Sequence, residues 1–251
     1  MNEYILELFK KEKRIDNRDF LEYRKIEIIP NIIKKAEGSA SVKIGNTHLI
    51  AGVKLEIGKP FPDSPDEGVL IVNAEFPPLA SPEFEPGPPG ENAIELARVV
   101  DRVIRSSKAI KLNELKIDEE KVWCVFVDIH ILNDDGNLLD AACLASISAL
   151  LNTKIPKIEG DKIIRGEFEK KLPLVDKPVI VSVCRVGEKL FLDPNSEEEK
   201  VLDSKLSIGI NEKDLICGIQ KQGKPINFDI IEKMVDIAIQ KSKELRKIIC
   251  H

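Results

Sequence analysis

FEPGPPGENAIELARVVDR, residues 84–102, is the stretch that decides the fold, because a run of helix breakers gives way here to a strongly patterned helix. The prolines and glycines that fill its first part exclude regular structure. We predict a helix from Ile94 to Lys108 with Asn92 as its N-cap, since asparagine accepts hydrogen bonds from the free N–H groups at a helix start. At roughly 100° per residue, the branched apolar side chains share one broad face, so this helix must pack against a core.

The opposite face of the predicted helix carries Arg98, Arg102 and Arg105. Their spacing stacks them in one row, and a multivalent anion such as phosphate could bridge the guanidinium groups. A solvated surface is the simpler explanation on this helix alone. Glu95 precedes Arg98 by one helical turn and Asp101 precedes Arg105, so each acid could form a local ion pair.

The composition is that of an ordinary globular protein. The chain has 251 residues, 43% apolar and 32% charged, and its formal net charge is −5. Proteins that bind nucleic acid over a broad surface are usually basic, so any RNA site here must be a local patch. The scattered cysteines lack CxxC spacing, and no apolar run is long enough to span a membrane. We therefore predict a cytoplasmic protein that does not bind membranes.

The chain-wide pattern predicts one α/β domain, residues 1–251, whose mixed sheet is packed by central helices. The expected elements are a helix at 3–11, strands at 22–29, 39–45, 47–57, 69–74 and 122–132, a helix at 138–151, strands at 179–186, 189–192, 201–210 and 214–220, and a helix at 228–248. The long apolar strand 122–132 indicates a sheet covered on both faces. Two loosely similar halves meet near 160–178 without a convincing residue-level repeat.

Few residues point to chemistry of their own, and the short motifs of nucleotide-binding, zinc-dependent and serine-hydrolase sites are missing. His48 and His130 lie in predicted strands, where we expect them to be packed or paired. Cys143 lies in an apolar helix and is expected to be structural. The acidic run 197–199, with Asp203, could hold Mg²⁺, although a solvated acidic turn explains it more simply.

Five stretches, taken together and in this order, resemble the RNase PH family of phosphorolytic 3′→5′ exoribonucleases. They are RIDNR (14–18), KLEIGKP (54–60), FEPGPPGENAIELARVVDR (84–102), DDGNLLDAACLAS (134–146) and LDPNSEEE (192–199). The resemblance covers essentially the whole chain and is greatest to the non-catalytic ring subunits of the archaeal exosome. It implies an RNase PH-type α/β fold, shared with ribosomal proteins, in which two pseudo-symmetric halves of mixed sheet pack with central helices.

The first departure from the family pattern lies in the turn before the central helix. In active members this turn reads approximately Asp-x-Gly-Ser/Thr-Arg and binds the attacking orthophosphate. Here it reads Asp135-Gly136-Asn137-Leu138-Leu139, so leucines replace the hydroxyl and the guanidinium. The resemblance thus implies a degenerate phosphate site at Asn137, Leu138 and Leu139.

The second departure lies in the acidic pair that active members carry six residues apart, which holds Mg²⁺ or acts as a general acid. These positions fall on Glu199 and Lys205, and an ammonium group at the second position would repel a metal ion. Asp203 lies nearby but two residues short. A milder departure is Asn17, which replaces the usual glycine of the first motif and which tolerates positive φ.

These losses imply that the chain has no catalytic residues or metal site of its own. The resemblance implies a hexameric ring in which three copies alternate with a catalytic RNase PH-like paralogue, which binds Mg²⁺ and inorganic phosphate. RNA-binding cap subunits would cover one face, and single-stranded RNA would contact Arg98 and Arg102, and also Arg105 on the same face of the helix. Two alternatives stay open: an enzyme active on its own through Glu199 and Asp203, and a structural module without RNA contact.

Overall fold

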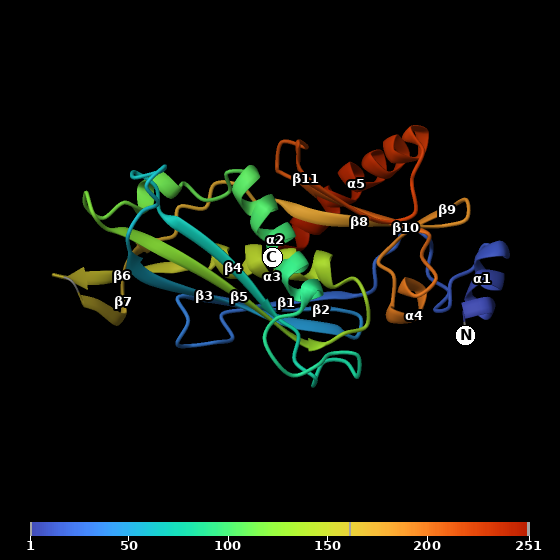
Figure 1. The fold of residues 1–251 in the computed structure, drawn as a ribbon, viewed down its shortest axis with the longest axis horizontal. Coiled ribbons are helices and arrows are strands. Elements are labelled where there is room, and N and C mark those ends of the chain that lie inside the picture. The colour runs from blue at the N-terminus through green and yellow to red at the C-terminus, as the bar shows by residue number, and fades with distance from the viewer. Residues whose placement is uncertain (1, 161, 250–251) are drawn as a thin grey trace.

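The computed structural model describes residues 2–160 and 162–249, which form two main sheets with helices between and around them (Figure 1). The helices are α1 (Asn2–Lys10), α2 (Glu91–Ser106), the 3-10 turn η1 (Leu112–Leu115), α3 (Leu138–Leu151), α4 (Ser196–Glu199) and α5 (Phe228–Ile249). The strands are β1 (Ile26–Pro30), β2 (Gly38–Ile44), β3 (Thr47–Gly58), β4 (Val69–Glu75), β5 (Val122–Asn133), β6 (Lys154–Glu159), β7 (Lys162–Lys171), β8 (Val179–Val186), β9 (Lys189–Leu192), β10 (Ser204–Ile210) and β11 (Ile216–Gly223). None of the described helices has the length and apolarity needed to cross a membrane.

The first half of the chain builds a five-stranded sheet in the order β1-β2-β3-β5-β4, and the second half a four-stranded sheet in the order β11-β10-β8-β9. Only β4 and β5 pair in parallel within the larger sheet, and the smaller sheet is antiparallel throughout. The predicted mixed α/β interior is therefore confirmed. The β6–β7 hairpin forms a separate two-stranded sheet between the two halves in sequence.

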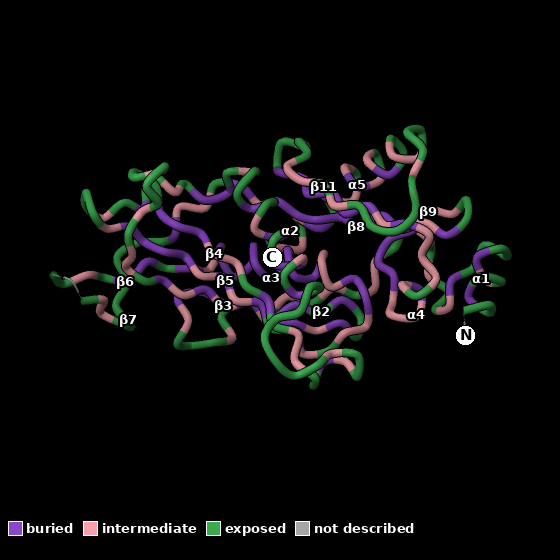
Figure 2. The backbone as a smooth tube through the Cα atoms, in the orientation of Figure 1, coloured by how far each residue is buried: buried purple, intermediate pink, exposed green. Residues whose placement is uncertain are grey.

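Helix α3 is the centre of the core, because it contacts β2 and β3 on one side and β8 on the other. Its alanines and serines allow this close approach, and nearly all of its side chains are buried. Gly38 of β2 marks how tight the packing is, since a Cβ there would lie 2.5 Å from the carbonyl oxygen of Ala149. Figure 2 shows the buried backbone running through this central layer and the exposed backbone at loops and hairpin tips.

Helix α2 lies on β4 and β11 and so joins the two halves of the molecule. Its predicted apolar face is confirmed, with Leu96, Val99, Val100, Val103 and Ile104 buried. A Cβ at Gly209 of β10 would lie 2.4 Å from Val103 Cγ2, so glycine lets the helix sit directly on the small sheet. The opposite face of α2, with its arginines, is left at the surface beside the edge strand β11.

Two predictions at element ends were wrong. Helix α2 begins at Glu91 with Gly90 as its N-cap, so Asn92 lies inside the first turn and does not cap it. The strand predicted at 22–29 is shorter and shifted, because residues before Ile26 lie outside the strand. Pro30 closes β1, and a proline is tolerated there because β1 is an edge strand of its sheet.

The predicted cover on both faces of the large sheet was also wrong for this chain. Along β5 the side chains of one face are buried, whereas Phe126 and Asp128 on the other are half-buried and His130 is exposed. The β6–β7 hairpin was not predicted, because its mostly exposed β7 shows no alternation of apolar and polar residues. The acidic run 197–199 belongs to the one-turn helix α4, which Asn195 caps with its side chain.

Candidate nucleic-acid interface

A buried carboxylate, Asp193, joins three of the sequence motifs that were singled out above. It accepts hydrogen bonds from Arg18 Nη1 at 2.9 Å, from the Arg24 backbone, Nε and Nη2 at 2.8 Å each, and from Asn137 Nδ2 at 2.9 Å. Burial alone would raise the pKa of Asp193, but its hydrogen bonds and ion pair with Arg24 outweigh burial, so the pKa lies below its usual value. We call Arg14, Arg18, Arg24, Asn137, Asp193 and Glu198 the Asp193 hub.

Arg14 makes the other ion pair of the hub, with Glu198 of α4. Both side chains are fully buried, and the guanidinium binds the carboxylate at 3.0 and 2.5 Å. It also donates to the carbonyls of Leu192 and Asp193 at 2.9 and 2.8 Å, so its hydrogen-bonding groups are well satisfied. The RIDNR motif therefore stabilises the fold, because its Arg14 binds Glu198 and two backbone carbonyls. Its Asn17 has φ of +60°, which confirms that asparagine replaces glycine there without difficulty.

The turn before α3 is closed by groups of this same chain. Asn137 has φ of +58°, the conformation that a glycine adopts most easily, and its backbone N–H donates to Glu199 Oε1 at 3.2 Å. Leu138 and Leu139 follow it and are half-buried. A carboxylate thus lies at the N-terminus of α3, where an orthophosphate would otherwise bind. The residues present do not fit orthophosphate.

Lys205 lies next to Glu199, and its Nζ is 3.3 Å from Glu199 Oε1. Burial alone would lower the pKa of Lys205, but the charge and hydrogen bond of Glu199, together with the other acidic groups nearby, outweigh burial, so the pKa is raised and the ammonium keeps its proton. Asp203 is turned to other partners, accepting from the Gly187 N–H at 2.7 Å and from Lys224 Nζ at 2.6 Å.

This arrangement does not fit Mg²⁺, because the ammonium group of Lys205 lies 3.3 Å from the Glu199 carboxylate and would repel a metal ion there. Among the described residues there is no cluster of three or more histidine, cysteine or acidic side chains that could hold a metal ion.

The three arginines of α2, which we call the arginine ridge, all lie at the surface as predicted, but they differ in their partners. Arg105 is held within the chain, because it pairs with Asp101 at 2.8 Å and donates to the Leu70 carbonyl at 3.0 Å. Arg102 makes one long hydrogen bond, 3.4 Å from Nη1 to Gln220 Oε1. Arg98 has no hydrogen bond or ion pair with any of the residues that the structure describes.

The ion pair expected between Glu95 and Arg98 is not formed. Glu95 is turned toward β11, where its Oε1 accepts from Gln220 Nε2 and Gln222 Nε2, each at 2.8 Å. Periodicity along the helix could not reveal this contact, because the two glutamines come more than a hundred residues later in the chain. Arg98 and Arg102 line a shallow pocket of about 390 Å³ on this side of the helix.

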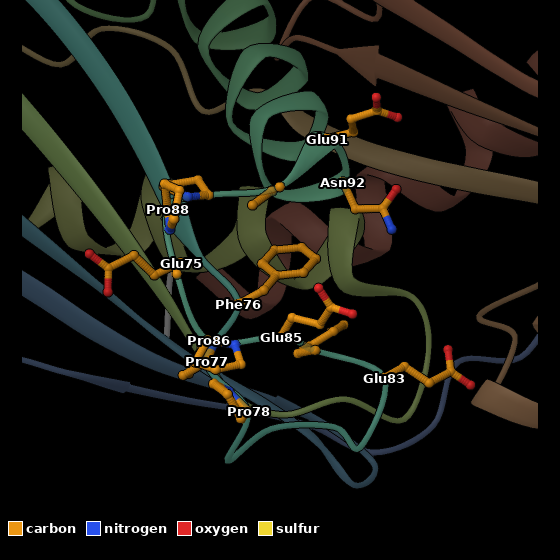
Figure 3. A pocket seen from close by; sticks show the side chains of 15 residues that line it. Glu75, Phe76, Pro77, Pro78, Glu83, Glu85, Pro86, Pro88, Glu91 and Asn92 are labelled. Atoms are coloured by element: carbon orange, nitrogen blue, oxygen red, sulfur yellow. The ribbon is translucent and has the colours of Figure 1, made fainter.

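A larger pocket of about 880 Å³ lies at the proline-rich loop before α2 (Figure 3). Figure 3 shows Phe76 in its middle, with the carboxylates of Glu75, Glu83 and Glu91 spread around it. Its lining also includes Glu85 and contains no lysine or arginine. Phosphate groups would be repelled there, so the arginine ridge is the better candidate for binding an RNA backbone.

The two histidines are paired, and Cys143 is buried, as predicted. His48 Nε2 lies 2.8 Å from Ser41 Oγ, and His130 Nδ1 lies 3.3 Å from Glu75 Oε2. Cys143 is fully buried in α3, and burial raises the pKa of its thiol well above the usual range. The cysteines of the described residues are all free thiols, and Cys250 lies outside those residues.

Comparison with known proteins agrees with these features. Residues 22–156 match the model of the 3′ exoribonuclease family, domain 1 (RNase PH), and residues 176–241 match domain 2 of the same family. The chain belongs to the RNase PH family. The two matches leave residues 157–175 between them, a segment that contains most of the β6–β7 hairpin.

Relatives extend the match to nearly the full length. The exosome complex component Rrp42 of Archaeoglobus fulgidus is 51% identical over 98% of this chain and 94% of its own length. A structure described as the Archaeoglobus fulgidus exosome with RNA bound to the active site contains a chain with a TM-score of 0.93 and 51% identity, covering 98% of this chain and 96% of that one. An archaeal exosome core contains another, with a TM-score of 0.89 and 47% identity over 100% of this chain and 96% of that one. The predicted RNase PH-type fold is confirmed.

Proposed function

We propose that this chain is a non-catalytic subunit of an archaeal-type exosome ring. It pairs with a catalytic RNase PH-like paralogue, and the complex degrades RNA from the 3′ end by phosphorolysis. The observation that carries the proposal is the ion pair of Lys205 with Glu199, because the resemblance to active members of the family implies a second acid at position 205, and this chain has a protonated amine there. The names of the matched relatives and structures, all exosome components, support the assembly.

The chain's own groups give no route to phosphorolysis. The N-terminus of α3 is occupied by the Glu199 carboxylate, and Leu138 and Leu139 offer no hydrogen bond to an attacking phosphate. Activity through Glu199 and Asp203 is not supported either, because Asp203 is bound to Lys224 and the Gly187 amide. Mg²⁺ and inorganic phosphate therefore belong to the paralogue's site in this proposal.

In this proposal the chain contributes a binding site for the phosphates of the RNA backbone. Arg98 and Arg102 are four residues apart on α2, so their Cα atoms are separated by about 6 Å along the helix axis. Both guanidinium groups are at the surface, and neither is paired with a carboxylate of the described residues. Arginine binds phosphate oxygens in pairs, and such contacts hold RNA without reading its sequence. The proposal includes three copies of each subunit in a hexameric ring, RNA-binding cap subunits on one face and a cytoplasmic location.

The first test is phosphate-dependent degradation of 5′-labelled poly(A) with Mg²⁺, comparing this chain alone with the complex that co-purifies with it. We expect nucleoside diphosphates from the complex only. Release of diphosphates by the pure chain would overturn the assignment and make it an enzyme in its own right.

The second test is RNA binding by the complex carrying Arg98→Ala and Arg102→Ala. If each arginine binds one phosphate, affinity falls for all sequences, and the slope of log K against log salt decreases by about one to two units. The matched control is Lys233→Ala with Lys247→Ala, which removes the same charge from exposed positions on α5. Equal affinity and salt slope in the arginine variant and the wild type would instead favour a structural module without RNA contact.

A further inference from the structure

We propose that Gln220 and Gln222 of β11 are positioning residues for the RNA-binding arginines. They hold the Glu95 carboxylate away from Arg98, and Gln220 also orients Arg102. This inference rests on the proposed function, since it concerns how the same ridge is kept open to an anion.

The geometry of β11 brings both amides to one place. Side chains two residues apart on a strand point to the same face, and that face of β11 is turned toward α2. Gly218, two residues before Gln220, lies on the same face, where an added Cβ would sit 3.1 Å from Val103 Cγ2. The missing side chain lets α2 come close enough for both glutamines to reach Glu95 at 2.8 Å.

Without these amides, Glu95 has an obvious alternative partner. A glutamate three residues before an arginine on a helix lies within reach of it, and such an ion pair stabilises the helix. Such a pair would occupy Arg98 and place a negative charge beside the approaching phosphates. The two neutral amide donors satisfy the carboxylate without consuming a guanidinium group, so Arg98 is left for an external anion.

Gln220 has a second role because it is bonded on both sides. Its amide nitrogen donates to Glu95, and its amide oxygen accepts from Arg102 Nη1 at 3.4 Å. This chain of hydrogen bonds fixes which end of the amide faces each partner. Arg102 is thereby oriented by a neutral group. Its long hydrogen bond to Gln220 can break at little cost when a phosphate binds.

The inference is tested by a mutant cycle in the assembled complex, with labelled oligo(A) binding measured in the absence of phosphate. Gln220→Ala with Gln222→Ala frees Glu95, and we expect the affinity to fall about two- to fivefold. Adding Glu95→Gln to that variant should restore the affinity, whereas Glu95→Gln in the wild type should change it much less. A loss caused by damaged packing would not be rescued by removing a charge.

Two outcomes would overturn the inference. One is unchanged affinity in the double glutamine variant, and the other is an equal gain from Glu95→Gln in both backgrounds. If the double variant folds poorly, Gln222→Ala alone serves, because the Gln222 side chain donates to Glu95, and a smaller loss rescued by Glu95→Gln is expected. Arg98→Ala is measured alongside. If Arg98→Ala leaves the RNA affinity unchanged, the proposed function of the arginines is wrong. If Arg98→Ala lowers the affinity but the glutamine variants do not, only the positioning role of the glutamines is wrong.

Discussion

The Asp193 hub and the arginine ridge each contain three arginines, but the partners of these arginines differ. In the hub, Arg14, Arg18 and Arg24 are each bound by a carboxylate of this chain, and Asp193 and Glu198 have fully buried side chains. On the ridge, Arg98 and Arg102 are exposed to solvent and have no carboxylate partner among the described residues. Position relative to the core, and not residue type, therefore separates arginines that hold the fold from arginines left for a ligand.

The difference follows from the energetics of buried and exposed charge. A guanidinium in water is well solvated and loses little when it has no partner. A buried charge without its partner is strongly destabilising, so the hub must be satisfied from within the chain.

The largest effect expected is from Asp193→Asn, which removes the charge that both Arg18 and Arg24 bind. We expect a loss of about 3–5 kcal/mol in the free energy of unfolding, measured by urea denaturation at neutral pH. Because the pKa of Asp193 is lowered in the folded state, its contribution is present at neutral pH and is lost as the pH falls through that lowered value.

The matched variant on the ridge is Asp101→Asn, which breaks the exposed pair with Arg105. We expect a loss of less than about 1 kcal/mol there. Similar losses at the two sites would contradict the distinction between hub and ridge.

The next largest effect concerns Asp140 of α3, a buried carboxylate satisfied only by neutral groups. Tyr23 donates to it at 2.8 Å and Ser182 at 2.6 and 3.1 Å. Burial raises its pKa from 3.8 to about 6, whereas Asp193, bound by arginines, has its pKa lowered. Between pH 3.8 and about pH 6, Asp140 thus binds more protons in the folded state than in the unfolded state. The free energy of unfolding therefore falls as the pH rises through this range, by about 3 kcal/mol in all.

Asp140→Asn removes this dependence. The difference in unfolding free energy between variant and wild type should become more favourable to the variant by about 2 kcal/mol from about pH 4 to pH 7. Denaturation curves of both proteins at the two pH values measure it. A constant difference would mean that Asp140 titrates normally in the fold.

Much of this architecture could be predicted from the sequence because it follows from periodicity and turns. Strands β2 and β3, joined at Gly45-Asn46, and helices α3 and α5 were found within a few residues of their true ends. The arginine row of α2 follows from helical spacing alone. The resemblance to the family led to the hypothesis that Leu138, Leu139 and Lys205 replace catalytic groups, and this stays a prediction.

What the sequence could not give are contacts between distant segments. Arg14 is separated from Glu198 by 184 positions, so nothing local marks it as a buried ion pair. Glu95 looked like the natural partner of Arg98 because no local pattern places Gln220 beside it. The β6–β7 hairpin was not predicted because its exposed strands have little of the hydrophobic periodicity on which such predictions depend.

A smaller effect is expected from Lys205→Met, at the edge of the hub. The variant leaves Glu199 without its ion pair but keeps its hydrogen bond from the Asn137 amide. Because both side chains are partly exposed, we expect a loss of about 1 kcal/mol, measured by urea denaturation. The isolated variant should still release no nucleoside diphosphates, since the phosphate site is missing as well. A loss as large as that of Asp193→Asn would place Lys205 within the hub.

The smallest effect is expected from Arg105→Ala. This variant tests most directly whether pairing within the chain decides which arginines bind RNA. Arg105 belongs to the ridge by position but is satisfied within the chain, by Asp101 and the Leu70 carbonyl. Its loss should cost about 0.5 kcal/mol of stability, as for exposed pairs one helical turn apart. RNA affinity and its salt slope in the complex should change less than in Arg98→Ala, because the guanidinium must first leave Asp101 to bind a phosphate. An effect on RNA binding equal to that of Arg98→Ala would show that internal pairing does not decide which arginines serve the ligand, and the contrast between hub and ridge would then rest on burial alone.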